Sequence, residues 1–164
     1  MNNSNPFAPP TSHVEDIKSV GSRASSGFRL SASLLWRVLI VQTILGMPVL
    51  ALLSFAGGPS TETLIKLKPS LIFVVISFGM AVSLALTSRG ILFFPWGDRL
   101  NLSSAVWRRL GWLFSSLYLA LALSNLGVAY FAPLDAWAVY KLFFPLSAIV
   151  ALCIAASRAL PAEA

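Results

Sequence analysis

The chain has 164 residues, of which 57% are hydrophobic and 11% are charged, and its formal net charge is +6. A soluble domain has about 25% charged residues and, at this size, hides only about two thirds of its unfolded surface from water. The composition therefore excludes a soluble globular domain and a disordered chain, and lipid is the predicted solvent for most of the sequence. In a membrane protein, surplus Lys and Arg flank the spans, so we predict no nucleic-acid partner.

Residues 1–33 are polar and rich in Pro, Ser, Asn and Gly, without lasting apolar periodicity. We expect a disordered polar cytoplasmic tail here, with little fixed structure. Residues 6–10, Pro-Phe-Ala-Pro-Pro, favour extended backbone. This stretch is interpreted as part of a solvated tail, with a docking peptide as the less favoured alternative.

Four long runs, each almost free of charge, follow the tail. About 20 apolar residues cross the hydrocarbon of a bilayer, and backbone groups in lipid are satisfied by helical hydrogen bonds. We therefore predict an all-α membrane protein, with four transmembrane helices within residues 34–160. The predicted spans are about residues 36–56, 69–88, 110–132 and 136–158.

Three prolines fall in or at the start of these spans. Pro69 is expected in the first turn of the second helix, where its missing N–H costs nothing. Pro48 and Pro145 lie deeper in the first and fourth spans, where each is expected to bend its helix.

Basic residues are distributed unevenly around the four spans. With four spans, nine of the twelve Lys and Arg residues fall on one side of the membrane. These nine are Lys18, Arg23, Arg29, Arg37, Arg89, Arg99, Arg108, Arg109 and Arg158. Because loops rich in Lys and Arg face the cytoplasm, both termini are predicted to be cytoplasmic.

The longest predicted internal loop covers residues 89–109. We expect it to lie at the headgroup layer, with Trp96 and Trp107 as interfacial anchors. Asn101 or Ser103 is expected to cap a helix leading to Trp107. A partner-binding or catalytic loop is the less favoured alternative.

Asn125 and Lys141 are each eight residues from Pro133, the expected apex of the hairpin between the third and fourth spans. Antiparallel helices then place them at a similar depth, roughly 8–10 Å inside the span. The Asn125 carbonyl oxygen is expected to meet the Lys141 ammonium, and Trp137, one turn earlier, to make a cation–π contact with it. The group is interpreted either as a polar site for a lipid headgroup or an ion, or as a bond fixing hairpin register, worth about 0.6–2 kcal/mol. The second interpretation is favoured.

Small residues recur every four positions in the second, third and fourth spans. These predicted ridges are Gly79, Ser83 and Thr87; Ser116, Ala120 and Ser124; and Ser147, Ala151 and Ala155. Small residues let helices approach closely in lipid. We expect the ridges to pack within the bundle, although the same chemistry would serve an oligomer, so the oligomeric state stays open.

No set of catalytic or metal-binding residues emerges from the sequence. The six acids lie outside the predicted spans, the single histidine, His13, lies in the tail, and Cys153 has no second cysteine. Proton transfer or hydrolysis within a membrane usually needs buried acids or a Ser/His pair. We therefore predict a protein that is not an enzyme and that has no catalytic residues, metal site or cofactor.

From residue 64 onward, several polar and aromatic residues stand in a recognisable order. A Lys-Pro-Ser step enters a span, Trp and Leu precede the next, Asn lies within it, and Trp and a Tyr-Lys pair follow a short loop. In this order residues 64–160 resemble the intracellular septation protein A family, also called the inner-membrane-spanning protein family of bacteria. Matching positions are Lys68, Pro69, Ser70, Trp107, Leu110, Trp112, Phe114, Asn125, Trp137 and Lys141. Family members usually have five spans, whereas four are predicted here, and Tyr140 stands in place of the usual Phe.

The resemblance implies a multi-pass protein of the bacterial inner (plasma) membrane, linked to septation, cell division and the integrity of the cell envelope. Its implied partners are the lipid bilayer and other envelope or division membrane proteins, contacted without known catalysis. The alternative is a small transporter or lipid-binding membrane protein that uses Asn125 and Lys141. An enzyme acting on lipid-linked substrates through residues 89–109 is the least favoured interpretation.

Overall fold

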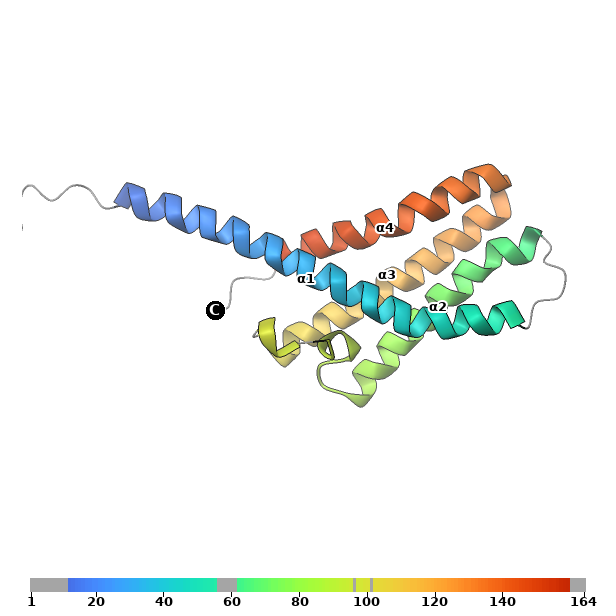
Figure 1. Cartoon of the computed structure of the whole chain (residues 1–164), viewed down its shortest axis with the longest axis horizontal. Coiled ribbons are helices and arrows are strands. Elements are labelled where there is room, and N and C mark those ends of the chain that lie inside the picture. The colour runs from blue at the N-terminus through green and yellow to red at the C-terminus, as the bar shows by residue number, and fades with distance from the viewer. Residues whose placement is uncertain (1–11, 56–61, 96, 101, 160–164) are drawn as a thin grey trace, which may run out of the picture.

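The computed structural model describes the backbone of residues 12–159 except 56–61, 96 and 101, and the side chains of the same residues apart from 12–26, 63, 98 and 99. Within this part of the chain every regular element is a helix (Figure 1). The long helices are α1 (Ser12–Phe55), α2 (Glu62–Leu86), α3 (Ser104–Phe131) and α4 (Leu134–Ala159). Two short 3-10 helices, η1 (Ile91–Phe93) and η2 (Gly97–Leu100), lie between α2 and α3.

Each long helix contains a stretch that is long and apolar enough to cross a membrane. The four stretches are Gly27–Phe55, Leu64–Leu86, Ser104–Phe131 and Leu134–Ala159. They confirm the predicted all-α fold with four spans, and each observed stretch overlaps its predicted span.

Helix α1 starts much earlier than the sequence predicts. Little fixed structure is expected up to residue 33, yet the structure carries the helix back to Ser12, and its N-terminal part projects beyond the other helices (Figure 1). Pro48 is the only proline inside α1, so every residue before it keeps the backbone donor that a helix uses. Residues 1–11 of the predicted tail lie outside the described residues, and the boundary at residue 33 stays a prediction.

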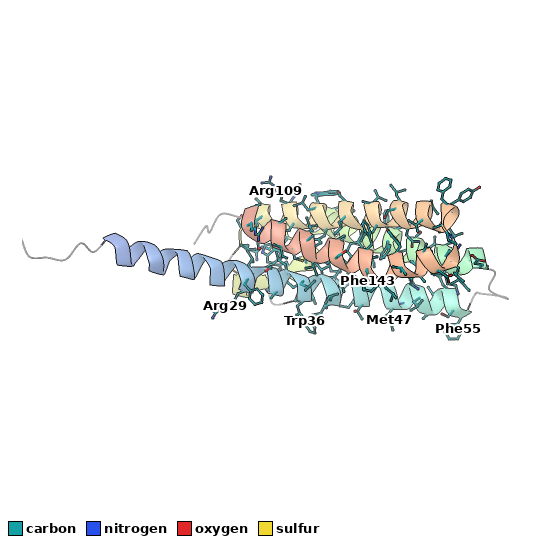
Figure 2. All side chains as sticks on the ribbon, turned by 90° about the horizontal axis from the view of Figure 1, so that it is seen from above. Arg29, Trp36, Met47, Phe55, Arg109 and Phe143 are labelled. Carbon is teal, nitrogen blue, oxygen red and sulfur yellow. The ribbon has the colours of Figure 1, made fainter. Side chains whose placement is uncertain are left out.

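The core of the bundle draws apolar side chains from all four long helices. It includes Leu34 and Val38 of α1, Ile76 and Met80 of α2, Trp107, Phe114 and Tyr118 of α3, and Ile149 and Cys153 of α4. Large apolar side chains also cover the outside, among them Met47, Phe55 and Phe143 (Figure 2). Because lipid tails are as apolar as these side chains, their exposure costs little in a bilayer.

Helices α2 and α3 make the most extensive contact in the bundle. At their crossing the Ser77 hydroxyl donates to the Ser115 carbonyl (2.8 Å), and the Ser115 hydroxyl donates to the Ser77 carbonyl (3.0 Å). One turn before Ser115, a Cβ added to Gly111 would lie 2.8 Å from Leu84 Cδ2. The absence of a side chain at Gly111 therefore permits the close approach of the two helices.

The small-residue ridges correspond only partly to packing faces. Gly79 does pack against α1, since an added Cβ would lie 3.0 Å from Leu45 Cδ1. The ridges of α3 and α4 face largely outward, and their exposed members are Ser116, Ala120, Ser147, Ala151 and Ala155. The expectation that these ridges pack within the bundle is therefore wrong for these five residues, whereas Ser124 of the α3 ridge is half-buried and contacts Tyr140 of α4. In α3 the close approach is provided by Gly111 and Ser115, which lie on a neighbouring face.

Pro69 lies inside α2, not in its first turn as predicted. The helix begins at Glu62, about two turns earlier at 3.6 residues per turn. Pro69 cannot donate to the Ile65 carbonyl, but interior prolines are tolerated in membrane helices where neighbouring groups satisfy the backbone.

The loop between α2 and α3 folds back against the bundle. Trp107, an expected interfacial anchor, is instead fully buried in the core, so that prediction is wrong. The Arg37 guanidinium carbon lies 5.1 Å from the centroid of its ring, and the Phe93 ring meets it edge-on with the centroids 5.8 Å apart. Trp107 therefore contacts other protein side chains and not the headgroup layer. Ser103 caps α3 as predicted, since its hydroxyl accepts from the Val106 N–H (3.4 Å). Trp96 and Asn101 lie outside the described residues.

Candidate functional site

Asn125 is a polar side chain that is almost completely buried, with 1% of its surface exposed. Its Nδ2 donates to the Lys66 carbonyl (3.1 Å) and to Ser70 Oγ (2.7 Å), both on α2. Its Oδ1 accepts from Trp137 Nε1 on α4 (3.2 Å). One amide on α3 therefore joins three helices, near the beginning of α2, the end of α3 and the beginning of α4.

Lys66 is a buried lysine that the sequence did not single out. Its Nζ lies 2.7 Å from Glu62 Oε1 and donates to the Ala132 carbonyl (3.0 Å). Ala132 is the C-cap of α3, where carbonyls lack helical donors and a positive charge is favourable. The four-residue spacing of Glu62 and Lys66 in the sequence is typical of an ion pair on one helix face. It indicates such a pair only if the helix already begins at Glu62, whereas the sequence predicts a start near Pro69.

Lys141 lies on the exposed side of α4, and its Nζ is 5.1 Å from the centroid of the Trp137 ring. This confirms the predicted cation–π contact. The predicted bond from Lys141 to Asn125 is not among the hydrogen bonds of the described residues. Trp137 contacts both side chains instead, with its N–H on Asn125 and its ring on Lys141.

Two further polar contacts join helices within the span. The hydroxyls of Ser124 on α3 and Tyr140 on α4 lie 2.5 Å apart. Tyr118 on α3 donates to Gln42 Oε1 on α1 (2.8 Å). In lipid, such polar pairs contribute to helix association that the hydrophobic effect does not drive.

The residues that match the family pattern divide between the two ends of the bundle. Lys68 is half-buried and Pro69 is buried in α2, one to two residues from the Ser70 that binds Asn125. Trp107 and Trp112 belong to the opposite end, where Trp107 is buried and Trp112 is half-exposed. The structure thus brings Asn125, Trp137 and the α2 step together and keeps the other two tryptophans apart from them.

The arginines and the carboxylates with described side chains lie at opposite ends of the bundle, and the three described lysines lie at the carboxylate end. The end where α2 ends and α3 begins, which we call the arginine end, holds six described arginines: Arg29, Arg37, Arg89, Arg108, Arg109 and Arg158. Figure 2 shows Arg29 and Arg109 toward this end and Phe55 at the other. The carboxylates with described side chains, Glu62 and Asp135, lie in the first turns of α2 and α4, at the end opposite the arginines.

Chemically, the contacts around Asn125 suit a role in holding helices together. The groups are one amide, one hydroxyl, an indole N–H, a lysine–glutamate pair and backbone carbonyls, and they bind one another. Among the described residues, no group of three or more His, Cys, Asp or Glu side chains is placed to hold a metal ion.

Four apolar helices joined by polar contacts define a multi-pass α-helical membrane protein. The particular family follows from the sequence. The chain belongs to the family described as intracellular septation protein A, whose model matches residues 31–162. The match begins at residue 31 and therefore includes most of the membrane-spanning part of α1. The resemblance seen in the sequence begins only at residue 64.

Several curated relatives carry the name inner membrane-spanning protein YciB. The chain is 36% identical to that of Methylibium petroleiphilum over 98 residues, covering 57% of this chain and 47% of the relative. It is 33% identical to that of Vibrio cholerae over 90 residues (53% and 48%). It is 28% identical to that of Paraburkholderia phytofirmans over 124 residues (76% and 66%).

The chain spans about half the length of the first two of these relatives. No solved structure matches it. It is therefore a multi-pass membrane protein of the septation protein A family, whose curated relatives span the inner membrane.

Proposed function

We propose that this protein supports septation and the integrity of the cell envelope from the bacterial inner membrane, through contacts with other membrane proteins. The observation that carries the proposal is the family match over residues 31–162. The names of the relatives support an inner-membrane location, and the four apolar helices fit it. A role without catalysis is part of the proposal. It is supported by the positions of the six acids, because five lie outside the four apolar stretches and the sixth, Asp135, lies in the first turn of α4.

We also propose that both termini lie in the cytoplasm. Nine of the twelve basic residues belong to segments on one predicted side of the membrane. The clustering of six arginines at the arginine end supports this, because Lys and Arg near span ends favour the cytoplasmic side.

The alternative of a transporter or lipid-binding protein that uses Asn125 and Lys141 is less well supported. The Asn125 amide is already bound to Lys66, Ser70 and Trp137. Lys141 rests on the Trp137 ring and is separated from Asn125 by that indole. A ligand at this position would meet the lysine alone, without the amide.

Deletion of the gene in its native host tests the main proposal. We expect longer cells with misplaced septa and a leaking envelope, and recovery of envelope or division proteins with the tagged chain purified from native membranes. The wild-type gene and an Ile76→Val variant should restore normal cells. An Ile76→Arg variant should not, because Ile76 is fully buried and a charge within a span is costly. Normal morphology after deletion, with no envelope or division protein recovered, would refute the proposal.

A further inference from the structure

A pocket of about 450 Å³ lies at the arginine end, where the chain turns from the end of α2 into η1. Its polar lining includes Thr87, Ser88 and Arg89, and its apolar lining includes Leu86, Phe93 and Phe94. The apolar stretch of α2 ends at Leu86, so the pocket lies where the predicted membrane interior gives way to the headgroup layer.

The turn that forms the pocket is fixed to α2 by two hydroxyl groups. Thr87 Oγ1 accepts from the Gly90 N–H (3.0 Å), and Ser83 Oγ accepts from the Ile91 N–H (3.0 Å). Gly90 has φ of +69°, and a Cβ there would lie 2.6 Å from Leu84 Cδ2. The backbone around the pocket is therefore held in a conformation that glycine permits and other residues strain.

Phe93 connects the pocket to the buried core. The Arg89 guanidinium carbon lies 4.5 Å from the centroid of the Phe93 ring, and that ring meets Trp107 edge-on. On the core side, Arg37 covers Trp107 and donates from Nη1 to the Leu92 carbonyl (3.4 Å). The ring that contacts Arg89 is thus packed against a fully buried tryptophan, which holds that ring in place.

The surroundings of Arg89 combine positive charge with an exposed apolar surface. Leu86 is 79% exposed and Phe94 is 88% exposed. A phosphate group suits the arginine, whose planar guanidinium forms paired, charge-assisted hydrogen bonds with phosphate oxygens. An acyl chain suits the two apolar side chains. We propose that this pocket binds an anionic phospholipid, with the headgroup phosphate on Arg89 and an acyl chain along Leu86 and Phe94.

Lipid retention by the full-length protein tests this site. The purified protein is incubated in mild detergent with phosphatidylglycerol, with phosphatidylcholine or with inorganic phosphate, and the retained molecules are counted by native mass spectrometry. We expect wild type to retain phosphatidylglycerol in preference to phosphatidylcholine. Arg89→Gln should lower this retention about tenfold, because a charge-assisted contact is lost. Arg109→Gln, which removes an exposed arginine at the same end but outside the pocket lining, should retain as much as wild type.

Three results would overturn the proposal. The first is equal retention by Arg89→Gln and Arg109→Gln, which would leave only a diffuse attraction to the arginine end. The second is equal retention of phosphatidylcholine and phosphatidylglycerol. The third is displacement of the lipid by an equal concentration of inorganic phosphate, which would identify a phosphate site without an acyl chain.

Discussion

Asn125 shows how a single polar side chain can organise this bundle. Its amide binds two groups on α2 and one on α4 while it is almost completely buried. In lipid, removing it leaves the Trp137 N–H without its described acceptor, because no water is present to replace the amide. Lys141, eight residues past the hairpin apex, is exposed and leans on the face of the same indole. The two residues thus share Trp137 but contribute differently to the bundle.

This difference is measurable. We expect Asn125→Leu, which keeps the volume and removes three hydrogen bonds, to lower the free energy of unfolding by about 1–3 kcal/mol. Lys141→Met serves as the control and should change it by less, because it removes one exposed cation–π contact of about 0.5–1 kcal/mol. Unfolding of the detergent-solubilised protein by a denaturing detergent, followed by circular dichroism, gives both values. Equal losses in the two variants would contradict the assignment of the structural role to Asn125.

The pairing of α2 with α3 depends on one face of α3. Gly111 and Ser115 lie one turn apart on that face, against Leu84 and Ser77 of α2. Gly127, on the same helix, has no atom within 4 Å of an added Cβ. A side chain at position 111 would therefore overlap Leu84, whereas a side chain at position 127 would meet open space.

We expect Gly111→Val to destabilise the protein by about 1–3 kcal/mol, because the added atoms overlap Leu84. Gly127→Ala should be neutral or stabilising by about 0.5–1 kcal/mol, since alanine favours a helix over glycine. A Leu84→Ala change made together with Gly111→Val should recover part of the loss if the overlap is the cause. The same unfolding measurement applies, and a loss that Leu84→Ala does not reduce would show that Gly111 acts in another way.

The molecule as a whole has one end rich in arginine and another that carries the described carboxylates. The four long helices alternate in direction, so the ends of α2 and α4 lie on the side where α3 begins (Figure 1). With the proposed orientation, the arginine end and the phospholipid pocket face the cytoplasm, where anionic lipid attracts basic groups.

Reporter fusions test this orientation. A fusion after Ala164 should report the cytoplasm, and one after Asp135 should report the periplasm, because a single span separates the two positions. Two reporters are used, one that is active only in the cytoplasm and one that is active only in the periplasm, so that each fusion site gives a positive signal on either side. A periplasmic signal from the C-terminal fusion would contradict the proposed orientation.

The sequence by itself determined the lipid solvent, the four spans and the family resemblance. These properties depend on the length of uncharged runs and on the order of residues along the chain, both of which are local. The cation–π contact of Lys141 with Trp137 was also predictable, because one helical turn separates the two residues.

Only the tertiary structure decided which face of each helix is buried. Residues facing lipid and residues facing the core are equally apolar, so hydrophobic periodicity hardly distinguishes the two faces of a span. For that reason the sequence placed Trp107 at the interface and the Ser116 ridge inside the bundle, and it missed the burial of Lys66. The rotation of the helices, set by close contacts such as Gly111 against Leu84 and by the bonds of Asn125, fixed these positions.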